Sequence, residues 1–288
     1  MRIAASLIFA SAVSLGVTGA AWSQTPATKS MAPAAAAAPA AAAAPAVAKA
    51  PCANPDALGI GRVVEIDTTG GPGFGFEHFK QLDFLRDKEI VLTFDDGPWP
   101  PTTQRVLAAL AHECVRATFF LVGKPASEHP GLVRRIAAEG HTVGHHTWLH
   151  RSLMRIPPDE TTEEIDHGIA AVEMALHGVA SSTPTTPFFR FPGFESTPAT
   201  LELLQSRGIA VFGADLWAGD WKPMTPKQEL KVLIDRLNRA RKGIILLHDP
   251  KAQTAAMLPH FLRYLRDNQY RVVHVVPAAS GPDTDHVP

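Results

Sequence analysis

Residues 89–98 read Glu-Ile-Val-Leu-Thr-Phe-Asp-Asp-Gly-Pro, a short apolar run that ends in two carboxylates and a turn. Ile, Val, Thr and Phe favour strands, and a run of this length bounded by Gly and Pro predicts a buried β-strand. The apolar periodicity of residues 102–113 then predicts a helix directly after it. An alternating pattern of strand and helix therefore begins at residue 89.

The same alternation continues to residue 275. We expect strands at 89–94, 117–122, 141–145, 187–191, 209–214, 243–247 and 271–275, and helices at 102–113, 130–139, 159–177, 197–207, 226–241 and 254–267. This pattern predicts an α/β protein with parallel strands and crossover helices, either an open doubly wound sheet or a barrel. Because no Gly-rich phosphate loop follows the first strand, a nucleotide-binding open sheet is disfavoured.

Composition excludes several other classes of protein. The 288 residues carry a formal net charge of −1, so no basic surplus exists to bind nucleic acid. Two cysteines cannot build a disulfide-dense scaffold or a four-cysteine zinc site. The 13 histidines are the unusual feature, because four of them fall between residues 141 and 150.

The N-terminal segment is typical of an exported protein. Arg2 supplies a positive charge, residues 3–21 are mostly apolar, and Ala21-Trp22-Ser23 offers small residues where a signal peptidase cuts. We predict a signal peptide at 1–23, a periplasmic or secreted location, and no stable membrane insertion after cleavage. A retained signal anchor is the alternative, because this apolar run approaches the length that spans a bilayer.

The rest of the chain divides into four further segments. Residues 31–50 are mostly alanine interrupted by three prolines, so we predict a disordered Ala/Pro-rich spacer at 24–51. We expect an N-terminal extension at 52–86 that packs on the barrel, a catalytic domain at 87–276 and a disordered tail at 277–288. Cys52 and Cys114 could form a disulfide that pins the end of the spacer to the domain, and two unpaired thiols are the alternative.

Polar residues gather where the predicted strands end, which is where chemistry collects in a barrel of parallel strands. These residues are Asp95, Asp96, His145, His146, His150, Arg190, Asp220, Trp221, His248 and Asp249. Each has a simpler explanation, since paired Asp residues also form turns or helix caps and buried histidines often bind no metal. Their occurrence on successive strand ends favours a metallohydrolase.

The spacing of the histidines indicates metal ligands without selecting them. His146 and His150 are four residues apart, which places two imidazoles on one side of a helical turn. His141 and His145 share that spacing. Arg190 stands between two phenylalanines, and a charge among buried aromatics needs a partner.

At these motifs the sequence resembles the polysaccharide deacetylases with a NodB homology domain, carbohydrate esterase family 4. Thr93-Phe94-Asp95-Asp96-Gly97-Pro98 is similar to their first motif, and His146-Thr147-Trp148-Leu149-His150 to their second. Arg190-Phe191-Pro192-Gly193-Phe194, Asp220-Trp221 and Leu246-Leu247-His248 resemble the third, fourth and fifth. The resemblance covers about residues 87–276 in the family's motif order. It implies a distorted (β/α)7 barrel and selects His146 and His150 over His141 and His145.

The resemblance also implies a role for each residue. Asp96, His146 and His150 would hold a divalent metal, Zn²⁺ first, with Co²⁺ or another transition metal as the alternative. Asp95 would be the general base, oriented and kept ionised by Arg190, and His248 the general acid, held protonated by Asp220. The Gly193 backbone N–H would stabilise the oxyanion, and Trp221 and Leu246 would wall an acetyl pocket.

Two positions depart from the family's pattern. Phe194 stands where the third motif usually ends in glycine, which bears on substrate choice. Asp215 lies five residues before Asp220, whereas the family often has an Asp three residues before its Asp-Trp. This second difference bears on the role of Asp220.

The predicted function is metal-dependent hydrolysis of acetyl groups, N-acetyl before O-acetyl, on a glycan such as peptidoglycan or a chitooligosaccharide. The alternatives are a catalytically inactive carbohydrate-binding protein of the same fold and an O-acetyl xylan esterase.

Overall fold

Ten parallel strands form one sheet in the part of the chain that the structure describes, residues 52–75 and 83–279. The structure is a computed structural model. The predicted signal peptide and spacer, and residues 280–288 of the predicted tail, lie outside the described residues. The strands are β1 (Arg62–Ile66), β2 (Gly73–Phe74), β3 (Glu89–Asp95), β4 (Thr118–Leu121), β5 (Thr142–His145), β6 (Phe188–Phe189), β7 (Ala210–Phe212), β8 (Leu216–Trp217), β9 (Gly243–His248) and β10 (Arg271–Pro277).

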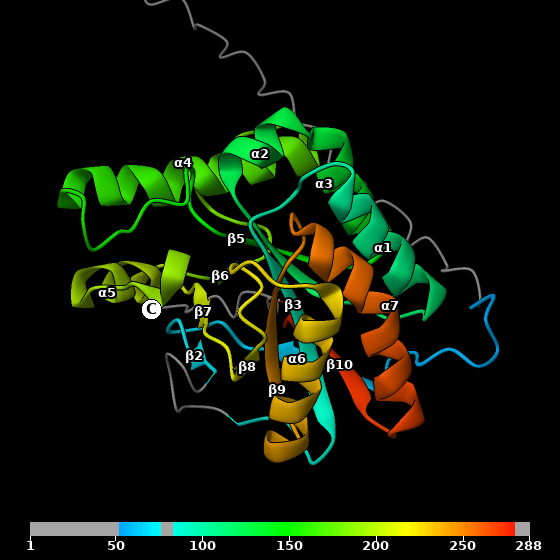
Figure 1. The fold of residues 1–288 in the computed structure, drawn as a ribbon. Helices are drawn as coiled ribbons and strands as arrows, with labels where there is room; N and C mark the ends of the chain where they lie inside the picture. The colour runs from blue at the N-terminus through cyan, green and yellow to red at the C-terminus, as the bar shows by residue number, and fades with distance from the viewer. Residues whose placement is uncertain (1–51, 76–82, 280–288) are drawn as a thin grey trace, which may run out of the picture. The chain divides into compact units, whose positions relative to one another are not determined.

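Helices connect most of these strands. They are α1 (Thr102–His112), α2 (Gly123–Glu128), α3 (Pro130–Ala138), α4 (Pro158–His177), α5 (Pro198–Ser206), α6 (Pro226–Ala240) and α7 (Ala252–Asp267), with a 3₁₀ turn η1 (Pro192–Phe194). Helices α1, α6 and α7 lie beside β3 and β9, whereas α2 and α3 pack against α4 (Figure 1). The predicted parallel strands with crossover helices are confirmed.

The sheet curves without closing. Its order is β1-β10-β3-β4-β5-β6-β7-β2, and β9 pairs with both β3 and β8. Among the described residues no strand pairing joins β8 to β7 or β2. The barrel is therefore open between the β2 edge of this order and β8, which is one sense in which it is distorted.

Three short strands and one short helix were not expected from the sequence. The segment 52–86 was expected to pack on the barrel. Its strand β1 pairs with β10, and its strand β2 pairs with β7. Strand β8 joins β9 through Leu216 and Trp217, and α2 is a six-residue helix. Strands β2 and β8 have only two residues each and carry no period-2 pattern, so only their partners reveal them.

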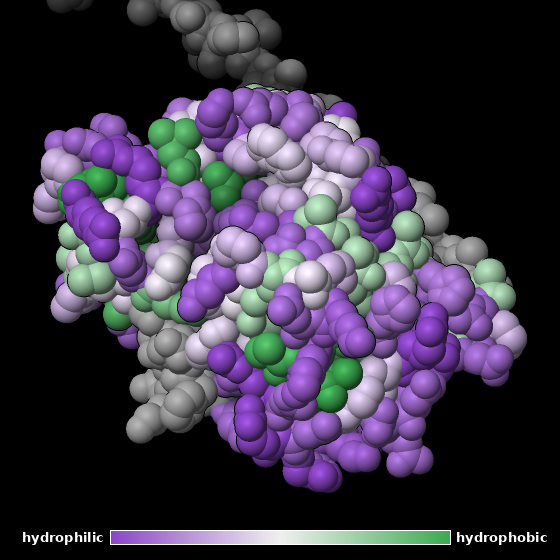
Figure 2. All heavy atoms as spheres, viewed as in Figure 1, coloured by the Kyte–Doolittle hydropathy of each residue, from purple (hydrophilic) through white to green (hydrophobic). Residues whose placement is uncertain are grey.

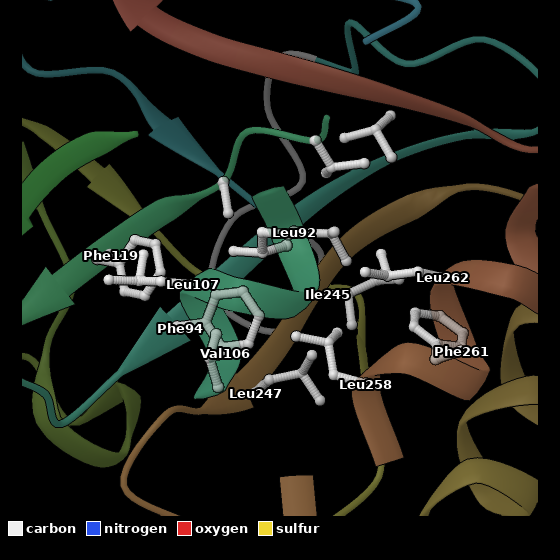
Figure 3. Close-up of a cluster of buried hydrophobic side chains, with 14 of the residues drawn as sticks. Leu92, Phe94, Val106, Leu107, Phe119, Ile245, Leu247, Leu258, Phe261 and Leu262 are labelled. Carbon is white, nitrogen blue, oxygen red and sulfur yellow. The ribbon is translucent and has the colours of Figure 1, made fainter. Parts of the chain in front are cut away.

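Alternation along β3 separates the hydrophobic core from the polar site. Leu92 and Phe94 pack with Ile245 and Leu247 of β9 against the helices (Figure 3), in a cluster that also includes Val106, Leu107, Leu258, Phe261 and Leu262. Each such buried side chain contributes about 1.5–3 kcal/mol through removal of its surface from water. Thr93 and Asp95 alternate with these residues and therefore face the barrel interior.

A disulfide joins Cys52 to Cys114, so the predicted pair is present. The extension is held further by polar contacts close to it. The Asn54 side chain donates to the His112 carbonyl at 3.2 Å, and the Leu58 N–H donates to Glu113 at 2.9 Å. The start of the described chain is thus attached to the end of α1.

No helix among the described residues is long and apolar enough to cross a bilayer. Figure 2 shows a face on which hydrophilic residues predominate and hydrophobic ones form small separate groups. Several of the large exposed hydrophobic side chains, including Trp99, Leu149 and Trp221, belong to the loops described next.

Candidate active site

The carboxyl ends of β3, β9, β5 and β6 bring most of the sequence-predicted residues together. Asp95 ends β3 and His248 ends β9, and the two are register partners. His145 ends β5 and pairs with Phe189 of β6, next to Arg190. Parallel strands place their carboxyl ends at one edge, so motifs far apart in the sequence meet there.

Asp96, His146 and His150 form a group of converging ligand atoms. The Asp96 Oδ1 atom lies 3.2 Å from Nε2 of His150 and 3.6 Å from Nε2 of His146. One ligand atom from each of the three lies within 4.8 Å of the others. Oδ1 of Asp96 is buried and has no hydrogen-bond partner. A buried carboxylate oxygen facing two imidazole nitrogens suits a cation, and this donor set suits Zn²⁺ or a similar transition metal.

A hydrogen bond and burial prepare His146 to act as a metal ligand. Its Nδ1 atom lies 2.7 Å from the Arg190 carbonyl oxygen, so Nδ1 carries the hydrogen and the Nε2 lone pair faces Asp96. Burial, with the neighbouring His150 adding to it, lowers the pKa of His146 to about 3. His146 is therefore neutral at physiological pH, as a metal ligand must be.

The loop that carries the two histidines is irregular. The helical turn indicated by their spacing is wrong: residues 146–150 form no helix, and Thr147 and His150 have φ of 64° and 58°. Thr147 and Trp148 accept backbone hydrogen bonds from residues 123 and 124 at the start of α2. The Trp148 ring stacks on His167 of α4 with centroids 4.1 Å apart. Contacts with α2 and α4, rather than helical geometry, bring the imidazoles together.

Asp95 and Arg190 form a buried ion pair. Nη1 of Arg190 donates to Oδ1 of Asp95 at 2.7 Å and to Oγ1 of Thr93 at 2.7 Å. The guanidinium also donates to the carbonyls of Phe212 and Gly213 and lies 4.3 Å from the centroid of the Phe120 ring. Arg190, which stands between two phenylalanines in the sequence, is thus paired with Asp95.

The charge state of Asp95 results from two opposed effects. Burial raises the pKa of this carboxyl above its usual range, and Arg190 opposes the increase. The sequence predicted only the second effect. A carboxylate whose pKa is raised by burial has the higher proton affinity that general-base catalysis needs.

His248 and Asp220 form the second charged pair. Nδ1 of His248 lies 2.8 Å from Oδ1 of Asp220, and the His248 backbone N–H donates to Oδ2 at 2.8 Å. Burial alone would lower the pKa of His248, but the hydrogen bond and charge of Asp220 outweigh it and raise this pKa to about 9. Nε2 of His248 faces Asp96, 4.0 Å from Oδ2.

Of the three residues expected to contact substrate, Trp221 and Leu246 lie near His248. Gly193 sits in η1 with φ of 60°, a conformation that favours glycine. Trp221 is half exposed, and its ring meets that of His248 at 80° with centroids 5.9 Å apart. Leu246 is buried on β9, two residues before His248 and therefore on the same side of the strand.

Similarity to known proteins now identifies the family. A family model described as polysaccharide deacetylase matches residues 84–212. The chain is 32% identical over 191 residues to a chitooligosaccharide deacetylase of Rhizobium leguminosarum bv. phaseoli, a match covering 65% of this chain and 80% of that protein. The chain belongs to the polysaccharide deacetylase family.

Two further polysaccharide deacetylases extend the comparison. A peptidoglycan-N-acetylglucosamine deacetylase of Listeria monocytogenes is 32% identical over 189 residues, which cover 66% of this chain and 38% of that protein. The chain therefore spans well under half the length of the Listeria protein. A solved peptidoglycan deacetylase of Bdellovibrio bacteriovorus superposes with a TM-score of 0.66 at 29% identity, covering 76% of this chain and 59% of that one. The predicted α/β fold and family are confirmed.

The structure explains one of the two departures from the polysaccharide deacetylase motifs. Asp215 does not lie beside His248; its Oδ2 accepts the Ile244 N–H at 2.7 Å at the start of β9. Asp220 is the residue that contacts His248. Phe194 continues η1 with φ of 59°, next to Gly193. Nothing in the structure explains why Phe rather than Gly stands there.

A groove opens beside the metal-ligand group. It has a volume of about 560 Å³, and Asp96 and His150 form part of its wall. Its other lining residues are Trp99, Val122, Lys124, Pro125, Glu128, Leu149 and Pro250. Trp99 is 50% exposed, and Nζ of Lys124 pairs with Oε1 of Glu128 at 2.6 Å. The Trp99 ring forms an aromatic wall, and the Lys124–Glu128 ion pair adds no net charge. Such a groove suits an uncharged sugar ring.

Sequence reasoning assigned no role to four residues that support the site. Thr93 and Thr254 hold Arg190 and Asp220 through their hydroxyls. Asp249 accepts a hydrogen bond from Thr103 and lies so close to Gly97 that no Cβ would fit there. Thr93, Gly97 and Asp249 fall within or beside the quoted motifs, which is a usable signal. Thr254 belongs to no motif.

Proposed function

We propose that this polysaccharide deacetylase is a metal-dependent hydrolase that removes acetyl groups from an acetylated glycan, N-acetyl in preference to O-acetyl. Peptidoglycan and chitooligosaccharides are the proposed substrates, because the relatives that match are named for them. The observation that carries the proposal is the meeting of three groups at one sheet edge. These are the metal-ligand group, the Asp95–Arg190 pair and the His248–Asp220 pair.

The metal site is proposed to consist of Asp96, His146 and His150. Their donor set fits Zn²⁺ first, with Co²⁺ or another transition metal as the alternative. When bound there, the metal supplies Lewis-acid polarisation to the water and the acetyl carbonyl.

The protein's own residues supply the proton transfers. Asp95 would take a proton from the attacking water, while Arg190 fixes its Oδ1 through the bond of 2.7 Å. The Gly193 N–H would donate to the oxygen on which negative charge develops. Nε2 of His248, protonated because its pKa is about 9, would then donate to the leaving amine or alcohol.

The remaining assignments concern fit and location. Trp221 and Leu246 would bound the space for the acetyl methyl group. We also propose export to the periplasm or the exterior, on the basis of residues 1–23. The Cys52–Cys114 disulfide supports this, since such bonds persist in oxidising compartments.

Acetate release by the purified chain tests the function. The substrates are peptidoglycan, chitooligosaccharides and acetylxylan, assayed before and after chelation and after addition of Zn²⁺ or Co²⁺. We expect release from the amino-sugar polymers that a chelator abolishes and metal restores. Release that a chelator leaves intact would contradict the metal site, and release from acetylxylan alone would assign an O-acetyl esterase.

Two variants and a control separate catalysis from binding. Asp95→Asn should reduce kcat by a factor of about 10²–10⁴ with metal still bound, since a general base contributes about that much. His146→Ala should lose both metal and activity. His260→Ala removes an exposed histidine of α7 and should change neither. Glycan binding by the unaltered chain without any release would instead support the inactive binding protein.

A further inference from the structure

A carboxylic acid outside the five motifs lies behind the His248–Asp220 pair. Glu229, on α6, is completely buried, as are Asp220 and Thr254. The Thr254 hydroxyl oxygen lies 2.9 Å from Oδ2 of Asp220 and 2.9 Å from Oε1 of Glu229. Oε2 of Glu229 has no hydrogen-bond partner. One hydroxyl group therefore bridges two buried carboxyl groups.

The hydrogens available to this bridge show that one carboxyl is protonated. A threonine hydroxyl carries a single hydrogen and can donate to only one acceptor. If both carboxyl groups were ionised, one would face the hydroxyl oxygen without any hydrogen between them. A buried unpaired carboxylate is far more costly than a buried carboxylic acid. A second hydrogen must therefore lie on Asp220 or on Glu229.

The groups around Asp220 and Glu229 determine which of these two carboxyl groups carries the second hydrogen. Asp220 accepts hydrogen bonds from both Nδ1 and the backbone N–H of His248, and two donors stabilise its ionised form. Within the described part of the chain, the Glu229 carboxyl hydrogen-bonds only with the Thr254 hydroxyl. The groups whose charges act on it are Asp220 and His248, and burial together with Asp220 raises the pKa of Glu229 to about 7. Its place in the first turn of α6 favours ionisation slightly, and complete burial outweighs this.

We propose that Glu229 is a positioning residue that acts as a neutral acid, donating its hydrogen to Thr254 so that the Thr254 hydroxyl donates to Asp220. Asp220 then accepts three hydrogen bonds and stays ionised beside His248. The role deepens the proposed function, because it rests on His248 as the general acid. The existence of the neutral acid does not depend on that function.

Infrared difference spectroscopy of the purified chain tests the protonation without substrate. The spectrum of Glu229→Gln is subtracted from that of the unaltered protein at mildly acidic and neutral pH. We expect the C=O stretching band of a buried carboxylic acid in the unaltered protein that is missing in the variant. Other buried acids such as Asp249 cancel in the difference. A difference spectrum with a carboxylate band and no carboxylic acid band would overturn the proposal.

The pH profile of acetate release tests the positioning. Below about pH 7, where Glu229 carries its hydrogen, the neutral Gln amide donates a hydrogen bond as the acid does, so Glu229→Gln should keep kcat within about twofold there. Thr254→Val removes a donor from Asp220 and should lower the pH at which the basic side of the profile falls by about one unit, with KM unchanged. A fall in kcat well beyond about twofold for Glu229→Gln at mildly acidic pH would mean that an ionised carboxylate is needed there, and would overturn the proposal.

Discussion

Gly168 of α4 controls the position of the metal-ligand loop, and its replacement by alanine is a sharp test of the site. A Cβ at this position would lie 2.3 Å from the carbonyl carbon and 2.6 Å from the oxygen of Thr147, and 2.7 Å from the nitrogen of Trp148. All three atoms belong to the backbone, so no side-chain rotation relieves the contact. The loop between His146 and His150 must shift by roughly 1 Å to reach ordinary contact distances.

Two effects of opposite sign determine the change in the free energy of unfolding. Alanine in place of glycine in a helix stabilises by about 1 kcal/mol. Inserting a methyl group into a closely packed contact costs about 1–3 kcal/mol. We therefore expect Gly168→Ala to lower the free energy of unfolding by up to about 2 kcal/mol. Because the loop carries two ligands, we also expect metal affinity to fall by about 10–100-fold, the usual effect of disturbing a ligand's support.

Urea unfolding and competition with a chromophoric chelator measure the two effects. Gly131→Ala is the matched control, since Gly131 also lies in a helix, α3, and a Cβ there would have no neighbour within 4 Å. It should leave metal affinity unchanged and stability unchanged or raised by up to about 1 kcal/mol. If Gly168→Ala were as stable as Gly131→Ala and bound metal as tightly as the unaltered chain, the reasoning about the loop would be refuted.

Three other predictions concern the disulfide, the groove and the charge of His248. Replacing Cys52 and Cys114 by serine opens a loop with a sequence separation of 62 residues. The larger entropy of the unfolded chain should then lower the free energy of unfolding by about 4 kcal/mol. An unchanged midpoint of urea unfolding would refute this prediction. Trp99→Ala should raise KM for chitooligosaccharides but not for a small acetyl ester, and Trp99→Phe should restore it; equal effects on both substrates would exclude a sugar contact. The pKa of His248 is about 9 in the folded protein and about 6.5 in the unfolded chain. In the metal-free protein, protonated His248 therefore contributes about 3 kcal/mol to the free energy of unfolding. This contribution is complete below about pH 6.5 and is lost as the pH rises to about 9. Unfolding measured across that range should show the loss, and Asp220→Asn should flatten it.

The predictable part of the fold is the part in which local sequence and final position agree. The run 89–94 is apolar, rich in strand formers and closed by Asp-Gly-Pro, and it forms β3 over Glu89–Asp95. Helix 226–241 is found as Pro226–Ala240, after a Thr225 side chain that accepts the Gln228 N–H. Buried strands and capped helices carry their own signals, so their bounds differ by only a residue or two.

The parts that could not be predicted depend on distant partners. Strand β2 consists of Gly73 and Phe74 and exists because they pair with β7. The loop 146–150 brings its imidazoles together through α2 and α4 rather than through helical spacing. Thr254 bridges Glu229 and Asp220 only because α6 and α7 pack against each other. No pattern within a segment encodes such contacts.

The opposing charge states at the site determine which residue can be the base. His248 has a pKa of about 9 and is protonated at neutral pH, so it can give a proton but cannot take one. Asp220 is engaged by His248 and Thr254, and Asp96 faces the two imidazoles of the metal-ligand group. Asp95 is the remaining carboxylate of the motifs. Only its Oδ1 is bound by Arg190, and burial increases its proton affinity. Acid and base are thus separated by environment, which supports the proposed assignment of Asp95 as base and His248 as acid.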